Sequence, residues 1–145
     1  MSTAFSKVVS AVMAALSASP AVCKNIYRAR AMAIPDKDDE AVSVQWEQGL
    51  PRSGTIGGAP IDWQTRVSVD CYASSFGVSV TGDVAVDPLL EKVYERLAAD
   101  PTLGGMTDDF VIVGVEAENT VDGKKTGWVR LTYVAEHRTQ NLLLS

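Results

Sequence analysis

Cysteine and histidine are scarce in this sequence, which limits the chemistry it can support. Its 145 residues include two cysteines, Cys23 and Cys71, and one histidine, His137. The cysteines form neither a CxxC pair nor a metal-ligand spacing, so we expect buried reduced thiols, with a disulfide as the alternative. One histidine cannot build a His-rich metal site, and no nucleophile motif accompanies it. We therefore expect no catalytic residue, no metal and no cofactor.

Basic residues and long apolar runs are also lacking. The chain has 13 Lys and Arg against 18 Asp and Glu, a net charge of -5, which argues against nucleic-acid binding as the main function. No run approaches the roughly 18 apolar residues that span a bilayer. Three serines interrupt the apolar stretch 5–18, so a secretory signal is not expected. With 46% apolar and 21% charged residues, the composition is typical of one globular domain over 1–145.

Two stretches have helical periodicity. In residues 5–16 the apolar side chains recur at helical spacing, with Ser2 or Thr3 available as the N-cap, and Pro20 follows. In residues 84–99 the predicted buried stripe consists of Val86, Leu90, Val93 and Leu97, flanked by Leu89 and Tyr94. Asp87 and Pro88 form a typical helix start, with Asp83 as an earlier alternative. The sequence therefore predicts two amphipathic helices.

Four stretches have the period of two that indicates a strand, 25–34, 42–47, 66–74 and 128–138, and the apolar stretch 110–118 is predicted to be a further strand. An Asp122-Gly123 pair favours a tight hairpin between the last two. The predicted order along the chain is α-β-β-β-α-β-β. We therefore expect an α+β fold, a two-layer sandwich in which a mostly antiparallel five-stranded sheet carries both helices on one face.

The alternation leaves the other face of this sheet polar. Its charged residues are candidates for a subunit or partner interface: Arg28, Arg30, Glu47, Arg66, Asp70, Arg130, Glu136 and Arg138. Exposed antiparallel faces are common, so a solvated face is the alternative. The three tryptophans are expected to be core or interface anchors rather than base-stacking residues, because basic residues are not interleaved with them.

Residues 48–60 are too rich in glycine and proline for a regular element, and we expect a projecting loop. Its candidate contact residues are Gln48, Arg52, Ser53, Gly54, Thr55, Ile56, Gly57 and Gly58. The glycines lack the Gly-Lys-Ser/Thr ending of a phosphate loop. The acidic residues of 36–40 lack the spacing of an EF-hand, which favours a solvated turn over a cation site.

Two segments resemble the bacteriophage tail terminator, or tail completion, proteins of the lambda minor tail protein U type. Residues 87–105, DPLLEKVYERLAADPTLGG, are similar to the family's amphipathic helix and its DPTLGG-like turn. Residues 129–139, VRLTYVAEHRT, resemble the family's closing strand, with an L-T-Y-x-x-x-Y/H-R-T ending. Because the order of helices and strands is also similar, the likeness covers nearly the whole chain.

The resemblance implies a structural protein, not an enzyme, that caps the finished tail tube as a hexameric ring. Such a ring stops tube growth and offers a docking surface to the head and neck. The implied partners are further copies of the chain, the tail tube protein and a neck or head-completion protein, with a tail sheath protein as a further partner. DNA only passes through the lumen, and no membrane is involved. The implied location is the head-proximal tail end of the virion, and the host cytoplasm during assembly.

Two alternatives remain open at this point. Within assembly proteins, the chain could instead be a neck or head-completion connector, which binds the portal complex rather than tube ends. From another class, it could be a small-ligand binding domain or an enzyme that uses Asp108, Asp109 and His137.

Overall fold

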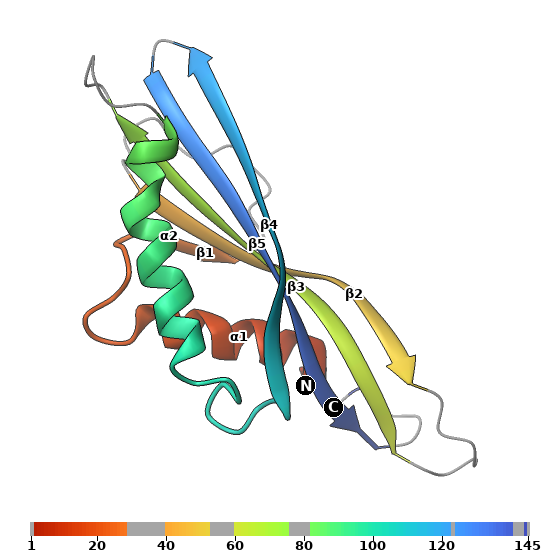
Figure 1. The fold of residues 1–145 in the computed structure, drawn as a ribbon. Helices are drawn as coiled ribbons and strands as arrows, with labels where there is room; N and C mark the ends of the chain where they lie inside the picture. Colours follow the sequence, from red (N-terminus) through yellow and green to blue (C-terminus); the bar gives the residue numbers. More distant parts are fainter. Residues whose placement is uncertain are drawn as a thin grey trace.

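The computed structural model describes residues 2–28, 40–52, 60–75, 82–122, 124–140 and 144. Its elements follow along the chain as α1 (Ala4–Ser17), β1 (Ile26–Arg28), β2 (Glu40–Arg52), β3 (Ile61–Ser75), α2 (Gly82–Ala98), β4 (Asp109–Asp122) and β5 (Lys124–Thr139). Two helices and one five-stranded sheet make this an α+β protein (Figure 1).

The first helix forms as its sequence predicts. Thr3 is the N-cap, and its side chain accepts a hydrogen bond of 3.2 Å from the backbone N–H of Ser6. The buried residues of α1 are Phe5, Val8, Val9, Val12 and Leu16, the predicted apolar stripe. At the far end, the Arg96 guanidinium on α2 donates to the carbonyl oxygens of Ala15 and Ala18, at 2.8 and 2.9 Å. These bonds satisfy carbonyls that a helix end leaves unpaired, and they tie the two helices together.

The second helix starts earlier than Asp87, and one residue of its buried stripe differs from the prediction. It begins at Gly82 and contains Pro88, so Asp87 is not its cap. The buried residues are Val86, Leu89, Val93 and Leu97, whereas Leu90 is only partly buried. Three of the four predicted stripe residues are therefore buried as predicted, and the flanking Leu89 takes the place of Leu90, because either leucine completes an apolar repeat. Packing on the sheet selects Leu89.

The sheet is mixed, and its strand order is not the chain order. From edge to edge the order is β1-β2-β3-β5-β4. Three pairings are antiparallel, but β1 pairs with β2 in parallel. Of the turn predicted over 35–40, only Glu40, the first residue of β2, is described, and the predicted strand beyond Arg28 lies outside the described residues.

The expected loop over 48–60 is wrong in its first part, because β2 continues to Arg52. Gln48 pairs with Arg66 and Arg52 with Asp62, after a register shift between Trp46 and Gln48. The bulge leaves Glu47 unpaired, and β2 then resumes its pairing with β3 as far as Arg52. Pro51 is tolerated because β1 covers β2 only at Val42–Val44, which leaves the other side of β2 without a ladder partner at that point. The remaining loop candidates, Ser53–Gly58, lie outside the described residues.

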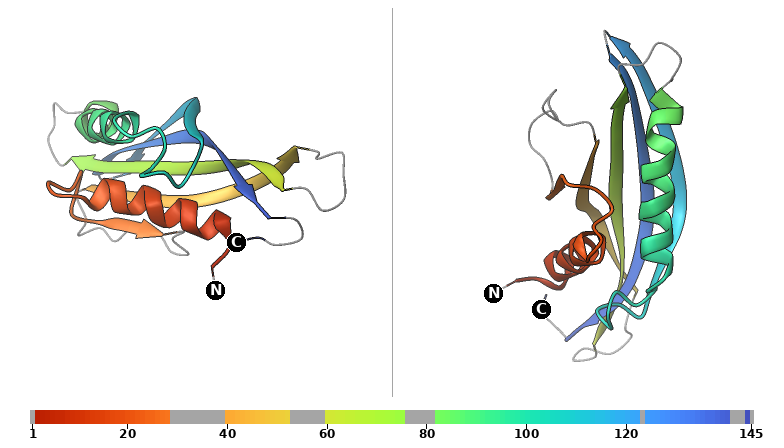
Figure 2. Two further views of the ribbon diagram at one scale, coloured as in Figure 1. Left: turned by 90° about the horizontal axis from the view of Figure 1, so that it is seen from below. Right: turned by 90° about the vertical axis from the view of Figure 1, so that its left-hand side faces the viewer.

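Both helices cover the same face of the sheet, as Figure 2 (right) shows. One core joins them to alternate residues of the strands, among them Val44, Val69, Leu131 and Ala135. The opposite face of the sheet carries no helix of the described chain (Figure 2). Both cysteines are free, as predicted. Cys71 lies in this core, and burial raises the pKa of its thiol to about 12.

Candidate functional site

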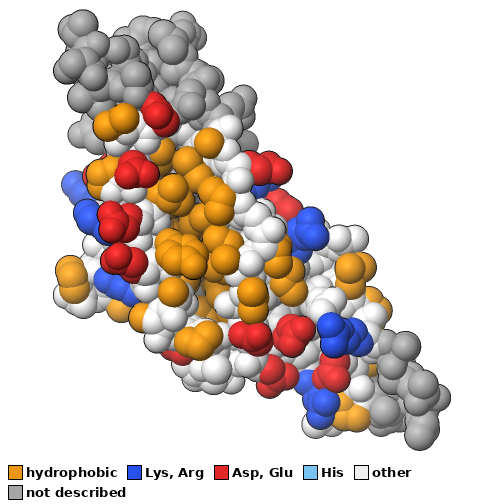
Figure 3. All heavy atoms as spheres, viewed as in Figure 1, with side chains coloured by type: hydrophobic (Ala, Val, Ile, Leu, Met, Phe, Trp, Pro, Cys, Tyr) orange, Lys and Arg blue, Asp and Glu red, His pale blue; other side chains and the backbone are white. Residues whose placement is uncertain are grey.

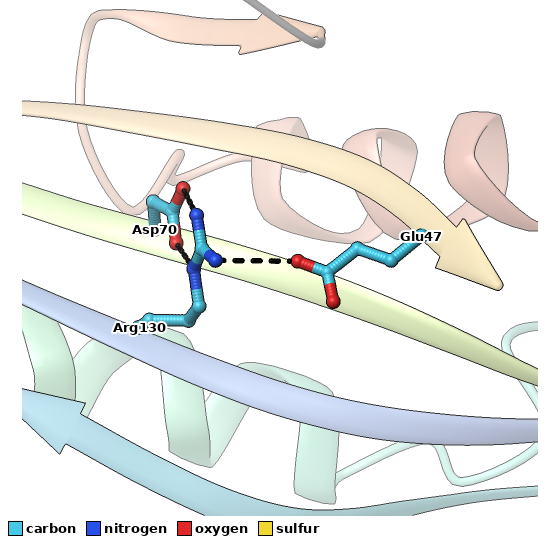
Figure 4. A network of polar contacts seen from close by, with 3 residues as sticks. All are labelled: Glu47, Asp70 and Arg130. Carbon is cyan, nitrogen blue, oxygen red and sulfur yellow. Dashed lines mark hydrogen bonds and ion pairs between the residues drawn. The ribbon is translucent and has the colours of Figure 1, made fainter.

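The uncovered face of the sheet holds a charge network at its centre. Arg130 donates to the Asp70 carboxylate from Nε to Oδ1 at 2.7 Å and from Nη2 to Oδ2 at 3.1 Å. Its Nη1 donates to Oε1 of Glu47 at 3.3 Å (Figure 4). Asp70 and Arg130 are direct cross-strand partners, and the Asp70 side chain is only 7% exposed. The hydrogen bonds that Arg130 donates to Asp70 raise the pKa of Arg130, so the positive charge of this arginine is stabilised within the chain.

A second group of ion pairs lies toward the end of β5. Arg138 donates from Nε to Oδ1 of Asp62 at 2.7 Å, and this bond lowers the pKa of Asp62. Glu136 accepts from Gln64 Nε2 at 3.3 Å and lies 3.8 Å from Nη2 of Arg52. The charges of both groups are therefore paired within the chain, which is sufficient to keep them on a solvated face.

One of the predicted interface arginines, Arg28, does not lie on the predicted face. Arg28 lies opposite Val44, on the helix side of the sheet, and donates to Ser10 Oγ at 2.9 Å and to the Ser6 carbonyl at 3.2 Å. Its placement on the uncovered face is wrong, because β1 is an edge strand from which a long side chain reaches the flank of α1. Arg66 is on the uncovered face, exposed and without an ion pair among the described residues. Arg30 lies outside the described residues.

The DPTLGG segment forms a compact turn between α2 and β4. Asp100 accepts from the Gly104 N–H at 2.7 Å and from the Thr102 hydroxyl at 3.1 Å. Leu103, Gly104 and Gly105 have φ of 49°, 72° and 89°, a region that glycine enters without steric cost. Leu103 is buried in the core. The segment that carries the family resemblance is therefore a structural unit that fixes where β4 begins relative to α2.

His137 occupies a buried niche at the end of β5. Its Nε2 shares a hydrogen bond of 2.6 Å with the Thr65 hydroxyl, and its ring packs edge-on against Phe5. Burial lowers the pKa of His137, and the nearby Asp108 opposes that shift. Asp108 uses its backbone N–H to donate to the Glu136 carbonyl at 2.7 Å. The described part of the chain contains no group of three His, Cys, Asp or Glu side chains placed to hold a metal.

Two of the tryptophans surround the start of α1. Phe5 stacks on Trp46 at 4.9 Å and meets Trp63 edge-on at 5.1 Å between ring centroids. Trp63 Nε1 donates to Thr139 Oγ1 at 2.8 Å. The third, Trp128, packs edge-on against Tyr72 at 5.9 Å. All three contact another aromatic ring within the chain, but none is fully buried and Trp46 is 45% exposed, so the prediction of core anchors is wrong and that of interface anchors stays a prediction.

An apolar groove that the sequence did not predict lies between α2 and β4. The groove measures about 470 Å³ and is lined by Asp87, Leu90, Glu91, Tyr94, Ile112, Val115 and Leu131. Figure 3 shows the apolar side chains of this surface as a continuous band with acidic residues along α2. The signal in the sequence is the unbroken run Phe110–Val113, because a strand with only one buried face alternates instead.

Comparison with protein families and with curated proteins finds no match to this chain. Within the described residues, no helix is both long and apolar enough to cross a membrane.

Proposed function

We propose that this chain is a structural virion protein that closes the end of a phage tail tube as a ring. In this role it stops tube polymerisation and presents a docking surface for the neck. The observation that carries the proposal is the resemblance of residues 87–105 to the tail terminator family, a segment that forms α2 and the Asp100–Gly105 turn in this chain. The mechanism is occupancy: a ring that covers the last layer of the tube satisfies the contacts that would recruit the next layer.

The fold offers surfaces suited to such a role. Among the described residues, one face of the sheet is covered by helices and the other carries none, while β4 is paired along one side only. A subunit that must contact neighbours on two sides and a tube below needs several distinct surfaces. The helix-covered face, the opposite face and the β4 edge differ in chemistry and could supply them. The net charge of -5 is compatible with a lumen through which DNA slides without binding.

The test is tube capping by the purified chain. Tail tube protein is polymerised in the presence and absence of the chain, and tube ends and lengths are examined by negative-stain electron microscopy. We expect rings at tube ends and a mean length that falls as the concentration of the chain rises. Uncapped tubes of unchanged length, together with a chain that stays monomeric in native mass spectrometry, would contradict the proposal.

A parallel arm separates the tail terminator from a neck or head-completion connector. The immobilised chain is offered tail tubes and, separately, portal complexes that lack tails. Retention of tubes is expected. Retention of portal complexes alone would identify the chain as a connector instead.

A further inference from the structure

The outer edge of β4 is open and apolar. In the sheet order, β4 has β5 as its one neighbour. The side chains of Val111, Val113 and Val115 are 46%, 54% and 55% exposed. Globular proteins usually protect an edge strand with charge, proline or a covering element, because an open apolar edge pairs with other chains. Among the described residues no element covers this part of β4, and its local protection is limited to a bulge between Ile112 and Gly114 and to the Glu116 that follows. The half-exposed valines still leave this edge suited to an interface.

The groove beside this edge extends the apolar surface onto α2. Leu90 and Tyr94 form its helix side, and Ile112 and Val115 form its strand side. Tyr94 is 46% exposed, and Asp87 and Glu91 lie along the rim. An apolar centre with a charged rim is the usual anatomy of a protein–protein contact.

The two edges of the molecule differ in charge. Residues 2–28, which form α1 and β1, contain Lys7, Lys24 and Arg28 and no acidic residue, and all three basic residues are exposed. Residues 82–122, which form α2 and β4, contain two basic residues, Lys92 and Arg96. Their acidic residues with described side chains are Asp83, Asp87, Glu91, Glu95, Asp100, Asp108, Asp109 and Glu116, of which Glu95 lies on the α1 side of α2. Among the described side chains, the α2/β4 edge is therefore mainly acidic. The α1/β1 edge is mainly basic, with the exposed Glu40 of β2 as its acidic neighbour.

We propose that the acidic α2/β4 edge of one copy binds the basic α1/β1 edge of a second copy. Opposite charge on the two edges makes this head-to-tail contact favourable, whereas joining two α2/β4 edges would bring like charges together. Each copy carries both edges, so the contact repeats from copy to copy and closes a ring where the rotation allows it. This inference rests on the proposed function, for which it names the contact between ring subunits.

Charge exchange tests the contact. Glu91→Lys and Lys24→Glu are exposed changes at opposite edges, so each is expected to leave folding intact. Each should raise the protein concentration needed for ring formation by about tenfold, because it places like charges across the contact. An equimolar mixture of the two variants should restore rings. In a ring in which the two variants alternate, each contact again joins a positive edge of one variant to a negative edge of the other.

Two further variants keep the result interpretable. Val113→Lys places a charge on the open edge and should also abolish rings, while circular dichroism and melting stay unchanged. Arg66→Glu tests the alternative contact on the uncovered sheet face, where Arg66 is a candidate interface residue, and ring formation should persist in this variant if the edges carry the contact. Native mass spectrometry at low and high salt is the readout, with rings weakened by salt.

The outcomes separate this inference from the proposed function. Rings that form normally with Glu91→Lys, Lys24→Glu and Val113→Lys would overturn the edge contact and leave tube capping standing. Loss of rings in Arg66→Glu alone would transfer the contact to the uncovered face. Oligomers that obey the charge exchange but never cap a tube would support the contact and contradict the proposed function.

Discussion

The Arg130 guanidinium binds the buried Asp70 carboxylate through two hydrogen bonds of 2.7 and 3.1 Å across neighbouring strands. Arg130→Met should lower the free energy of unfolding by about 1–3 kcal/mol, because Asp70 then loses its charged partner. Arg138→Met is the matched control. Its partner Asp62 is half-exposed, so we expect a clearly smaller loss, because solvent screens an exposed ion pair. Urea denaturation measures both, and equal losses would contradict this account of Asp70.

Because α2 buries Leu89 but only partly buries Leu90, truncating these two adjacent leucines should lower the free energy of unfolding by different amounts. Leu89→Ala should destabilise by about 2–5 kcal/mol, because Leu89 is fully buried and its truncation leaves a cavity. Leu90→Ala should cost clearly less, since Leu90 lines the open groove. Thermal and urea denaturation compare the pair. A larger loss at Leu90 would restore the stripe that the sequence predicts.

Gly49 gives β2 its close approach to α1. A Cβ at this position would lie 2.7 Å from Cε1 of Phe5, whose ring is held between Trp46 and Trp63. Gly49→Ala should therefore destabilise by about 1–3 kcal/mol. Gly114→Ala is the control, because no heavy atom lies within 4 Å of a Cβ there. Calorimetry should show a lower Tm for Gly49→Ala alone.

His137 makes stability depend on pH. Because burial lowers its pKa below the ordinary value of 6.5, the unfolded chain binds a proton more readily than the folded chain. The free energy of unfolding should be constant above the unfolded pKa and should fall as pH drops below about 6.5, until the folded pKa is reached. His137→Gln removes the chain's one histidine and should flatten this dependence between about pH 5.5 and 7. Urea midpoints across this range measure it.

Local patterns predicted what depends on one element and its own buried face. The Thr3 cap and the apolar stripe of α1 follow from short-range chemistry. The alternation of Val67 and Val69 likewise predicts the helix-covered face of β3, and both residues are fully buried there. These features need no knowledge of the neighbouring elements.

Features that depend on a neighbour could not be predicted. Leu89 and Leu90 are equivalent in sequence until α2 packs on the sheet. Gly49 and Pro51 indicate a loop until the bulge and the Phe5 ring are known. Arg28 has a polar-face pattern, but α1 lies within its reach. The alternation correctly predicts that Arg130 and Arg138 lie on the polar face of the sheet. Which carboxylates they pair with, Asp70 and Asp62, depends on the strand register, which the alternation does not give.

The unlike edges of the sheet give the subunit a polarity. If copies join basic edge to acidic edge, every copy must point the same way around the axis. The two flat sides of such an assembly would then differ, without any difference in sequence between subunits. A single gene product would thus supply one surface for a tube and another for a neck.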